Sequence, residues 1–216
     1  MNIFKKITLF TIITVSCFPL QSFATDTPKT EISSLEQKAN QGSAEAQYDL
    51  GQLYEKTNNK GVSQDYFKAV ELYTKAANQG LASAQYSLGK LYEESRGVPQ
   101  DCAKAVEWYT KAANQGLIEA QYSLGKLYEQ NHSNVSQDYV KAVEWYTKAA
   151  NQKIVLNKEN ITSYLIPQNS YNKLKSLLSS SDFKKSQDIL KIKEYLKQDC
   201  LNKHQNSCDF YKELNN

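Results

Sequence analysis

The chain has 216 residues and a formal net charge of +3 at pH 7. Residues 25–152 contain 13 basic and 16 acidic residues, a net charge of −3, and residues 153–216 contain 11 basic and 7 acidic residues, a net charge of +4. Nucleic-acid binding usually needs a concentrated basic face. Neither part of the chain has such an excess, so we expect no nucleic-acid partner.

The first 24 residues have the layout of a secretory signal peptide. Two lysines precede the apolar run Ile7–Leu20, and Ser22–Ala24 supplies small residues just before a cut. The run is shorter than the roughly 20 residues of a membrane-spanning helix. An uncleaved anchor and a lipid attached at Cys17 are the alternatives. The pattern predicts a periplasmic or secreted protein with no membrane span after cleavage, in which residues 25–33 form a short linker.

Three nearly identical twelve-residue segments follow. They are AVELYTKAANQG, AVEWYTKAANQG and AVEWYTKAANQK, and they occupy residues 69–80, 105–116 and 142–153. Each is preceded by a second recurring segment of the type AQYSLGKLYE. The spacing changes only in the stretch between the two segments, as expected for a surface turn that tolerates insertions. A repeat of this period predicts an array of stacked units.

Both halves of each unit are predicted to be helices. Apolar residues recur at i, i+4 and i+7 in the first half, as at Ala84, Leu88 and Leu91, and a similar stripe runs through residues 105–113. One glycine lies inside each first helix, where it costs about 1 kcal/mol relative to alanine. We expect this glycine to allow the close approach of a partner helix. The glycines inside the three first helices are Gly51, Gly89 and Gly125.

A two-helix hairpin cannot bury its apolar stripe alone, whereas stacked hairpins bury it against each other. Residues 34–42 (SLEQKANQG) look like a degraded second helix. The sequence therefore predicts an all-α solenoid over residues 34–152, made of three helix hairpins and an N-terminal half-repeat.

The segment Ala84–Gly116 resembles the Sel1-like repeat (SLR), a branch of the tetratricopeptide-like helical repeats. The resemblance implies a right-handed solenoid of antiparallel helix pairs. It also implies a scaffold or adaptor role, because the family mostly binds proteins. Two positions depart from the pattern: Asn134 replaces a turn glycine, and Lys153 replaces the glycine that closes the earlier second helices.

Residues 153–216 lose the repeat pattern. Pro167 is expected to interrupt the first part, followed by a short helix over residues 170–181. Residues 182–203 read as an amphipathic helix with Ile192 and Leu196 on its apolar stripe. We expect this C-terminal helical region to cap the array. A docking surface for a separate partner is the alternative.

Three cysteines remain after signal removal. Cys200 and Cys208 are too far apart to bridge within one continuous helix, but a polar turn between them would allow a disulfide, as suits an exported protein. Two free thiols are the alternative. Cys102 is expected to pack as a small hydrophobic residue.

The sequence contains no recognisable catalytic, metal or cofactor motif. Its two histidines, His132 and His204, have no context of a metal site or a catalytic triad. Some exported, cysteine-rich members of the family have been described as beta-lactamases, so a hydrolase of that type stays an alternative. Those proteins carry a cysteine pair in every repeat, which this chain lacks. A cell-wall-associated module is a further alternative.

A partner-binding face is predicted on the first helices, opposite their buried stripe. Tyrosine suits such contacts because its rigid ring ends in a polar group. In the family this face lines the concave groove, so we expect a monomer that binds a protein or peptide there. The alternative is that each ring packs on the next unit. The expected contact residues are Tyr48, Gln52, Tyr86, Lys90, Tyr122 and Lys126, with hydrogen bonds from Gln47, Gln85 and Gln121 beside them.

Overall fold

The computed structural model describes residues 28–56, 62–152, 161–180 and 188–215. The expected signal peptide, the possible lipid site at Cys17 and the departure at Lys153 lie outside these residues. Within them the chain is helical, apart from turns, extended connections and isolated bridge residues such as the pair His132 and Val135. No helix in this part of the chain is long and apolar enough to cross a membrane.

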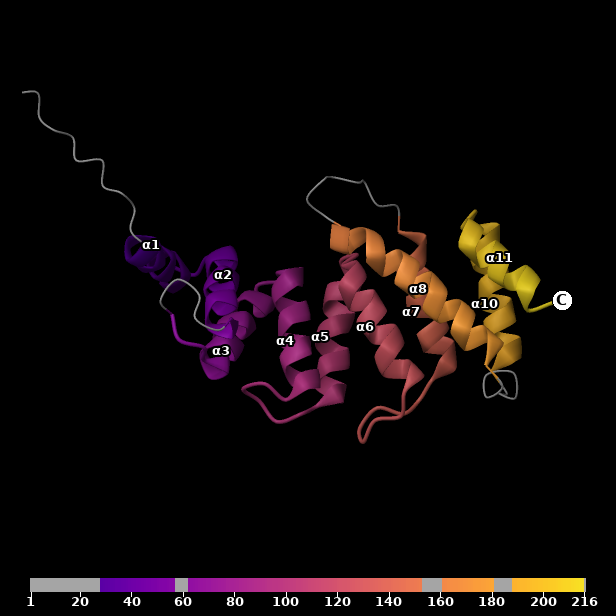
Figure 1. Cartoon of the computed structure of the whole chain (residues 1–216), viewed down its shortest axis with the longest axis horizontal. Helices are drawn as coiled ribbons and strands as arrows, with labels where there is room; N and C mark the ends of the chain where they lie inside the picture. Colours follow the sequence, from indigo (N-terminus) through magenta and orange to yellow (C-terminus); the bar gives the residue numbers. More distant parts are fainter. Residues whose placement is uncertain (1–27, 57–61, 153–160, 181–187, 216) are drawn as a thin grey trace, which may run out of the picture.

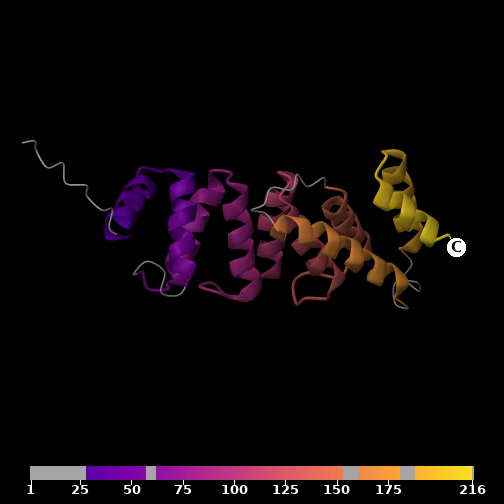
Figure 2. The ribbon, with the colours of Figure 1, turned by 45° about the horizontal axis from the view of Figure 1, so that its top comes forward.

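The helices follow one another along the long axis of the molecule, from α1 at one end to α10 and α11 at the other (Figure 1, Figure 2). Consecutive helices pack together, so α2 pairs with α3, α4 with α5 and α6 with α7. The prediction of an all-α solenoid of helix hairpins is confirmed. The helices are α1 (Pro28–Asn40), α2 (Ala44–Glu55), α3 (Tyr66–Asn78), α4 (Ala82–Glu94), α5 (Cys102–Asn114), α6 (Ile118–Glu129), α7 (Tyr139–Asn151), α8 (Ile161–Ser179), α10 (Ile189–Leu201) and α11 (Gln205–Glu213).

Helix α1 takes the place of a half-repeat before α2. It begins at Pro28, so the residues that we expected as a linker before Ser34 belong partly to this helix. Ala39 of α1 packs with Ala46 and Leu50 of α2 in a small apolar cluster.

Recurring caps set the bounds of the second helices. An aspartate precedes each of them, and its carboxylate accepts a hydrogen bond from the backbone N–H three residues later, as at Asp101 and Lys104 (3.0 Å). Gly116, with φ of 88°, follows α5 in the left-handed region. The N–H of Leu117 bonds back to the carbonyl of Ala112 at 3.2 Å, which closes the helix end.

The glycine inside each first helix allows the hairpin to close tightly, as the sequence predicted. A Cβ added at Gly89 would lie 2.7 Å from Cδ1 of Tyr109, and one at Gly125 would lie 2.5 Å from Cδ1 of Tyr146. Tyr109 and Tyr146 are fully buried. A large ring therefore fills the space that the missing side chain leaves.

The C-terminal helices cover the end of the array. Leu174 of α8, Ile192 of α10 and Phe210 of α11 share one apolar cluster with Val143 and Tyr146 of α7. This packing agrees with the expected cap.

A hydrogen bond between α11 and α7 is equivalent to one that links successive hairpins. Asn206 Nδ2 donates to the carbonyl of Ala150 at 3.0 Å, as Gln121 Nε2 donates to the equivalent carbonyl of Ala113 at 3.2 Å. The C-terminal region thus supplies the last helix end with the amide donor that a further repeat would have supplied.

Two expectations about the C-terminal region were wrong or incomplete. Helix α8 runs continuously through Pro167, which we expected to interrupt it. Ser170, Leu174 and Leu177 are buried at the spacing of a first-helix stripe, and the packing of the two leucines on α7 stabilises a helix that local propensity disfavours. Helix α11 was not predicted, because it is short and strongly polar apart from Phe210.

Candidate partner-binding surface

Each first helix of the three hairpins carries one half-buried tyrosine on the predicted face. We call Tyr48, Tyr86 and Tyr122 the tyrosine row. Each ring lies at a tilt against a buried tyrosine of its own hairpin and also packs against the apolar cluster formed with the following helices. The ring centroids are 5.6 Å apart for Tyr48 and Tyr73, 5.4 Å for Tyr86 and Tyr109, and 5.6 Å for Tyr122 and Tyr146.

The buried tyrosines fix three carboxylates beside the tyrosine row. The hydroxyl of Tyr109 donates to Glu93 at 2.6 Å, and the hydroxyl of Tyr146 donates to Glu129 at 2.8 Å. Tyr73 and Glu55 make the same contact at 2.7 Å in the first hairpin. Burial, and after it the neighbouring carboxylate, raises the pKa of the Tyr109 phenol far above its usual range. This phenol therefore stays protonated and keeps donating to the carboxylate.

The polar residues predicted on this face link the units or their own helix turns. Lys126 of α6 lies 3.9 Å from the carboxylate of Glu93 in α4, so this pair joins two successive hairpins. Lys90 lies 3.9 Å from Glu94 on its own helix. Gln52 donates to the hydroxyl of Tyr48 at 2.7 Å. The two lysine side chains are 40% and 45% exposed, so both ammonium groups are available to a partner.

The result is a row of half-exposed rings with ordered carboxylates and ammonium groups. A ring that is held by its neighbours loses little conformational freedom when a ligand binds, so it suits recognition. The same packing shows that the rings also contribute to stability.

The three glutamines that we expected beside the row have a different role. Gln47, Gln85 and Gln121 are buried. Gln85 Nε2 donates to the carbonyl of Ala77 at 3.1 Å, and its Oε1 accepts from Gln115 at 2.8 Å. These amides join a first helix to the helices on both sides of it, so the expectation that they contact a partner was wrong. Helical periodicity places a glutamine on a face but does not show that a helix end covers that face.

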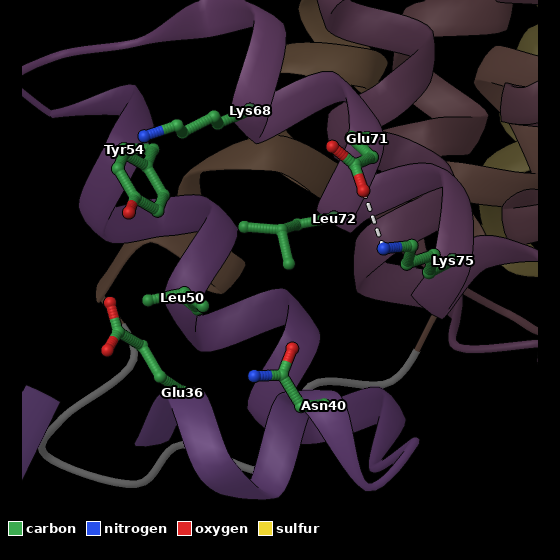
Figure 3. A pocket seen from close by; sticks show the side chains of 8 residues that line it. All are labelled: Glu36, Asn40, Leu50, Tyr54, Lys68, Glu71, Leu72 and Lys75. Carbon is green, nitrogen blue, oxygen red and sulfur yellow. Dashed lines mark hydrogen bonds and ion pairs between the residues drawn. The ribbon is translucent and has the colours of Figure 1, made fainter. Parts of the chain in front are cut away.

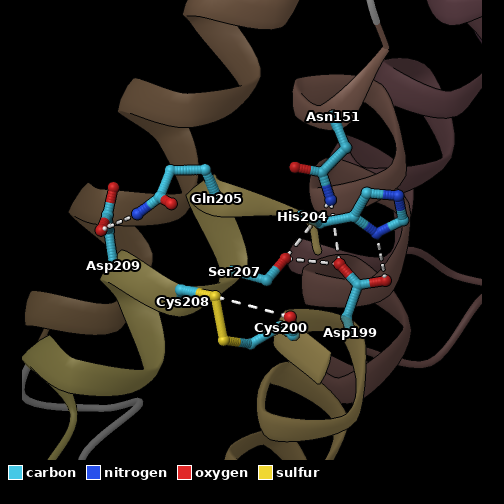
Figure 4. Close-up of a disulfide and its surroundings, with 8 residues drawn as sticks. All are labelled: Asn151, Asp199, Cys200, His204, Gln205, Ser207, Cys208 and Asp209. Carbon is cyan, nitrogen blue, oxygen red and sulfur yellow. Dashed lines mark hydrogen bonds and ion pairs between the residues drawn. A yellow bond between two sulfur atoms is a disulfide. The ribbon is translucent and has the colours of Figure 1, made fainter. Parts of the chain in front are cut away.

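The disulfide that we expected joins Cys200, at the end of α10, to Cys208, near the start of α11, with their Cα atoms 4.6 Å apart. The turn between the two helices allows the bridge, which one straight helix would prevent. Beside it, Asp199 binds side chains from three places (Figure 4). Asn151 of α7 donates to this carboxylate at 2.9 Å, His204 Nδ1 lies 2.9 Å from it, and the Ser207 hydroxyl also donates to it.

This cluster holds the C-terminal helices on α7 and differs from a catalytic triad. In a triad the histidine contacts the serine nucleophile and the acid orients the histidine. Here Ser207 and His204 both direct their polar atoms at Asp199. Across the described ranges, no group of three or more histidine, cysteine, aspartate or glutamate side chains could hold a metal ion.

Cys102 is a free and buried thiol at the start of α5, as expected. It packs with Ala105 and Leu127 in the apolar cluster between the second and third hairpins. Burial, with smaller effects from Glu93 and Asp101, raises the pKa of this thiol. A protonated, covered sulfur is a poor nucleophile.

Comparison with known proteins agrees with the repeat pattern. A family model described as Sel1 repeat matches residues 44–81, 82–117 and 118–153. A solved structure of a Sel1 repeat protein from Oxalobacter formigenes is 32% identical; the match covers 65% of this chain and 98% of that chain, with a TM-score of 0.52. The structure of c5321, a protective antigen of uropathogenic Escherichia coli with an SLR fold, is 25% identical over 85% of this chain and 56% of that chain, with a TM-score of 0.43. A search of curated proteins found no match.

Proposed function

Because the chain belongs to the Sel1 repeat family, whose repeats commonly mediate protein–protein interaction, we propose that it is an exported scaffold that binds a protein or peptide through the tyrosine row. The observation that carries this proposal is the recurrence of a half-exposed tyrosine, packed against a second ring, in three successive first helices. Aromatic residues dominate the energetics of protein interfaces.

The charges beside the row support a partner with groups of both signs. Lys90 and Lys126 present ammonium groups, and Glu93 presents a carboxylate that Tyr109 holds in place. An extended segment that crosses several hairpins would meet a tyrosine and an ordered glutamate at each unit, and a lysine at the second and third units. Binding rather than catalysis is the chemistry that these residues support.

Export is the second part of the proposal. The signal-peptide layout of residues 1–24 supports it, and so does the disulfide between Cys200 and Cys208, since such bonds persist outside the reducing cytosol. Mass spectrometry of the protein from its host should find a mature chain that begins at Thr25. A chain that starts at Met1 would contradict export through this signal.

The lysines give the cleaner test of binding, because the tyrosines also pack inside the protein and their removal would affect stability. Immobilised wild-type protein and the double variant Lys90→Glu/Lys126→Glu should be compared for capture of proteins from the host's envelope fraction. We expect the variant to capture at least about tenfold less of a specific partner, as is typical when charges at a binding site are reversed. Lys111→Glu/Lys148→Glu makes the same charge change on exposed positions of the second helices and should leave capture unchanged.

A variant that lacks two of the tyrosines is tested both for partner capture and for stability. Tyr86→Ala/Tyr122→Ala should keep the helical circular dichroism and weaken capture of the same partner. If the melting temperature falls sharply while the lysine variant captures normally, the rings are structural and the tyrosine row is not the binding site. A chromogenic lactam assay on the same protein separates the hydrolase alternative, and a peptidoglycan pull-down separates the cell-wall alternative.

A further inference from the structure

The first joint between units differs from the two later joints at one central position. Leu72 of α3 occupies the position that Trp108 holds in α5 and Trp145 holds in α7. Each of the three side chains packs on the apolar cluster of the preceding unit. An indole ring therefore covers the two later joints, whereas a much smaller isobutyl group covers the first.

A cavity of about 250 Å³ lies at this first joint, between α1, α2 and α3. Figure 3 shows Leu72 at the centre of the side chains that surround it. Eight residues line the cavity. At six of these positions both later joints have the same residue, and the two that differ are Leu72 and Glu36. The lining residues are Glu36, Asn40, Leu50, Tyr54, Lys68, Glu71, Leu72 and Lys75.

The later joints show what this lining accommodates. Lys111 Nζ lies 3.8 Å from the ring centroid of Trp108, and Lys148 Nζ lies 4.0 Å from that of Trp145. Such a lysine is attracted to the face of the indole ring. The equivalent Lys75 instead binds Glu71 at 2.6 Å. A ring that entered the first joint would find a lysine within reach of its face.

We propose that this cavity receives the tryptophan side chain of a protein partner. The pocket is smaller than the roughly 300–1,000 Å³ of small-molecule sites, so it suits one side chain. A buried indole N–H needs a hydrogen-bond acceptor. Glu36 supplies a carboxylate at the rim, where the later joints have Thr74 and Thr110. A carboxylate at this position is therefore present only in the joint that lacks its own tryptophan.

A second copy of the chain does not supply this ring. Its only tryptophans, Trp108 and Trp145, are half-buried in their own joints. Among the described residues, Phe67 is an aromatic residue that a second copy could offer, since it is 77% exposed. The site is separate from the tyrosine row, so it can be tested whether or not that row binds a partner.

The probe is N-acetyl-L-tryptophanamide, titrated into the ¹⁵N-labelled chain and followed by amide chemical shifts. We expect saturable shifts at Leu50, Leu72 and Lys75 with a dissociation constant of the order of millimolar, as for a ligand of this size. Leu72→Trp restores the residue of the later joints, so it should fold and melt at or above the wild-type temperature. Its own indole should weaken probe binding at least about tenfold.

Glu36→Thr tests the contribution of the carboxylate. It should weaken binding of the tryptophan probe by about three- to tenfold and leave binding of N-acetyl-L-phenylalaninamide, which has no ring N–H, unchanged. The absence of saturable shifts in the wild type, or equal shifts in Leu72→Trp, would overturn the proposal. So would wild-type dimerisation in sedimentation that Leu72→Trp abolishes, because a second copy would then be the occupant.

Discussion

Replacing Gly89 by alanine tests how tightly each hairpin closes. In an exposed helix this change stabilises by about 1 kcal/mol, because glycine has the greater backbone freedom in the unfolded chain. In this protein the new Cβ would lie 2.7 Å and 2.8 Å from two ring carbons of Tyr109 and 3.3 Å from the carbonyl oxygen of Ala105. The added methyl group has no room unless the ring or the α5 backbone moves.

The ring has little freedom to move. Tyr109 is 1% exposed, and its hydroxyl is held by Glu93 at 2.6 Å. Overpacking of a well-packed core costs about 1–3 kcal/mol. After the propensity gain of about 1 kcal/mol is subtracted, we expect a net loss of about 0–2 kcal/mol in the free energy of unfolding for the variant.

Urea unfolding followed by circular dichroism measures this loss. The control is Gly89→Ala in a Tyr109→Leu background, where the smaller side chain removes the clash. There the same change should be neutral or stabilising, so the double-mutant cycle should give a coupling of at least about 1 kcal/mol. A Gly89→Ala variant that is more stable than the wild type would refute the tight closure of the hairpin.

Three further predictions concern the joints and the C-terminal region. Gln85→Ala removes a buried amide with partners on both sides and should lower the free energy of unfolding by about 1–3 kcal/mol, whereas Gln130→Ala, at an exposed position, should change it little. Tyr109 and its two equivalents have pKa values raised by burial, so the folded state keeps protons that the unfolded state releases near pH 10. The free energy of unfolding should therefore be constant with respect to these groups below about pH 10 and fall above it. In a pH titration followed by tyrosine absorbance, these phenols should ionise only when the protein unfolds. Cys200→Ala/Cys208→Ala opens a bridge between residues 8 apart and should lower stability by about 2 kcal/mol, with faster hydrogen exchange in α10 and α11 and unchanged exchange in α4.

The hairpins could be predicted from the sequence because several independent features recur with the same period. The stripe with Leu88, the glycine at 89 and the turn glycine at 116 recur in register, so each supports the others. The buried tyrosine that fills the space at Gly89 has the same period. Local patterns of this kind are sufficient when every unit packs only on its neighbours.

The rest depended on contacts between units, which one helix does not reveal. Gln85 has the polarity of a surface residue, and only its position beside the end of α3 explains its burial. Pro167 argues for a break locally, but the packing of α8 on α7 outweighs it. The cavity at Leu72 also required the structure, although the change from tryptophan to leucine at this position is visible in the aligned repeats.

Site-specific photo-crosslinking in the native host tests the proposed function most directly. A photoreactive residue placed at Lys126, beside the tyrosine row, should give one specific crosslinked partner, and the same residue at Gln52 should give the same partner. At Glu107, an exposed position on a second helix, it should give none. Equal crosslinking at Glu107, or none at Lys126 and Gln52, would contradict binding through the tyrosine row.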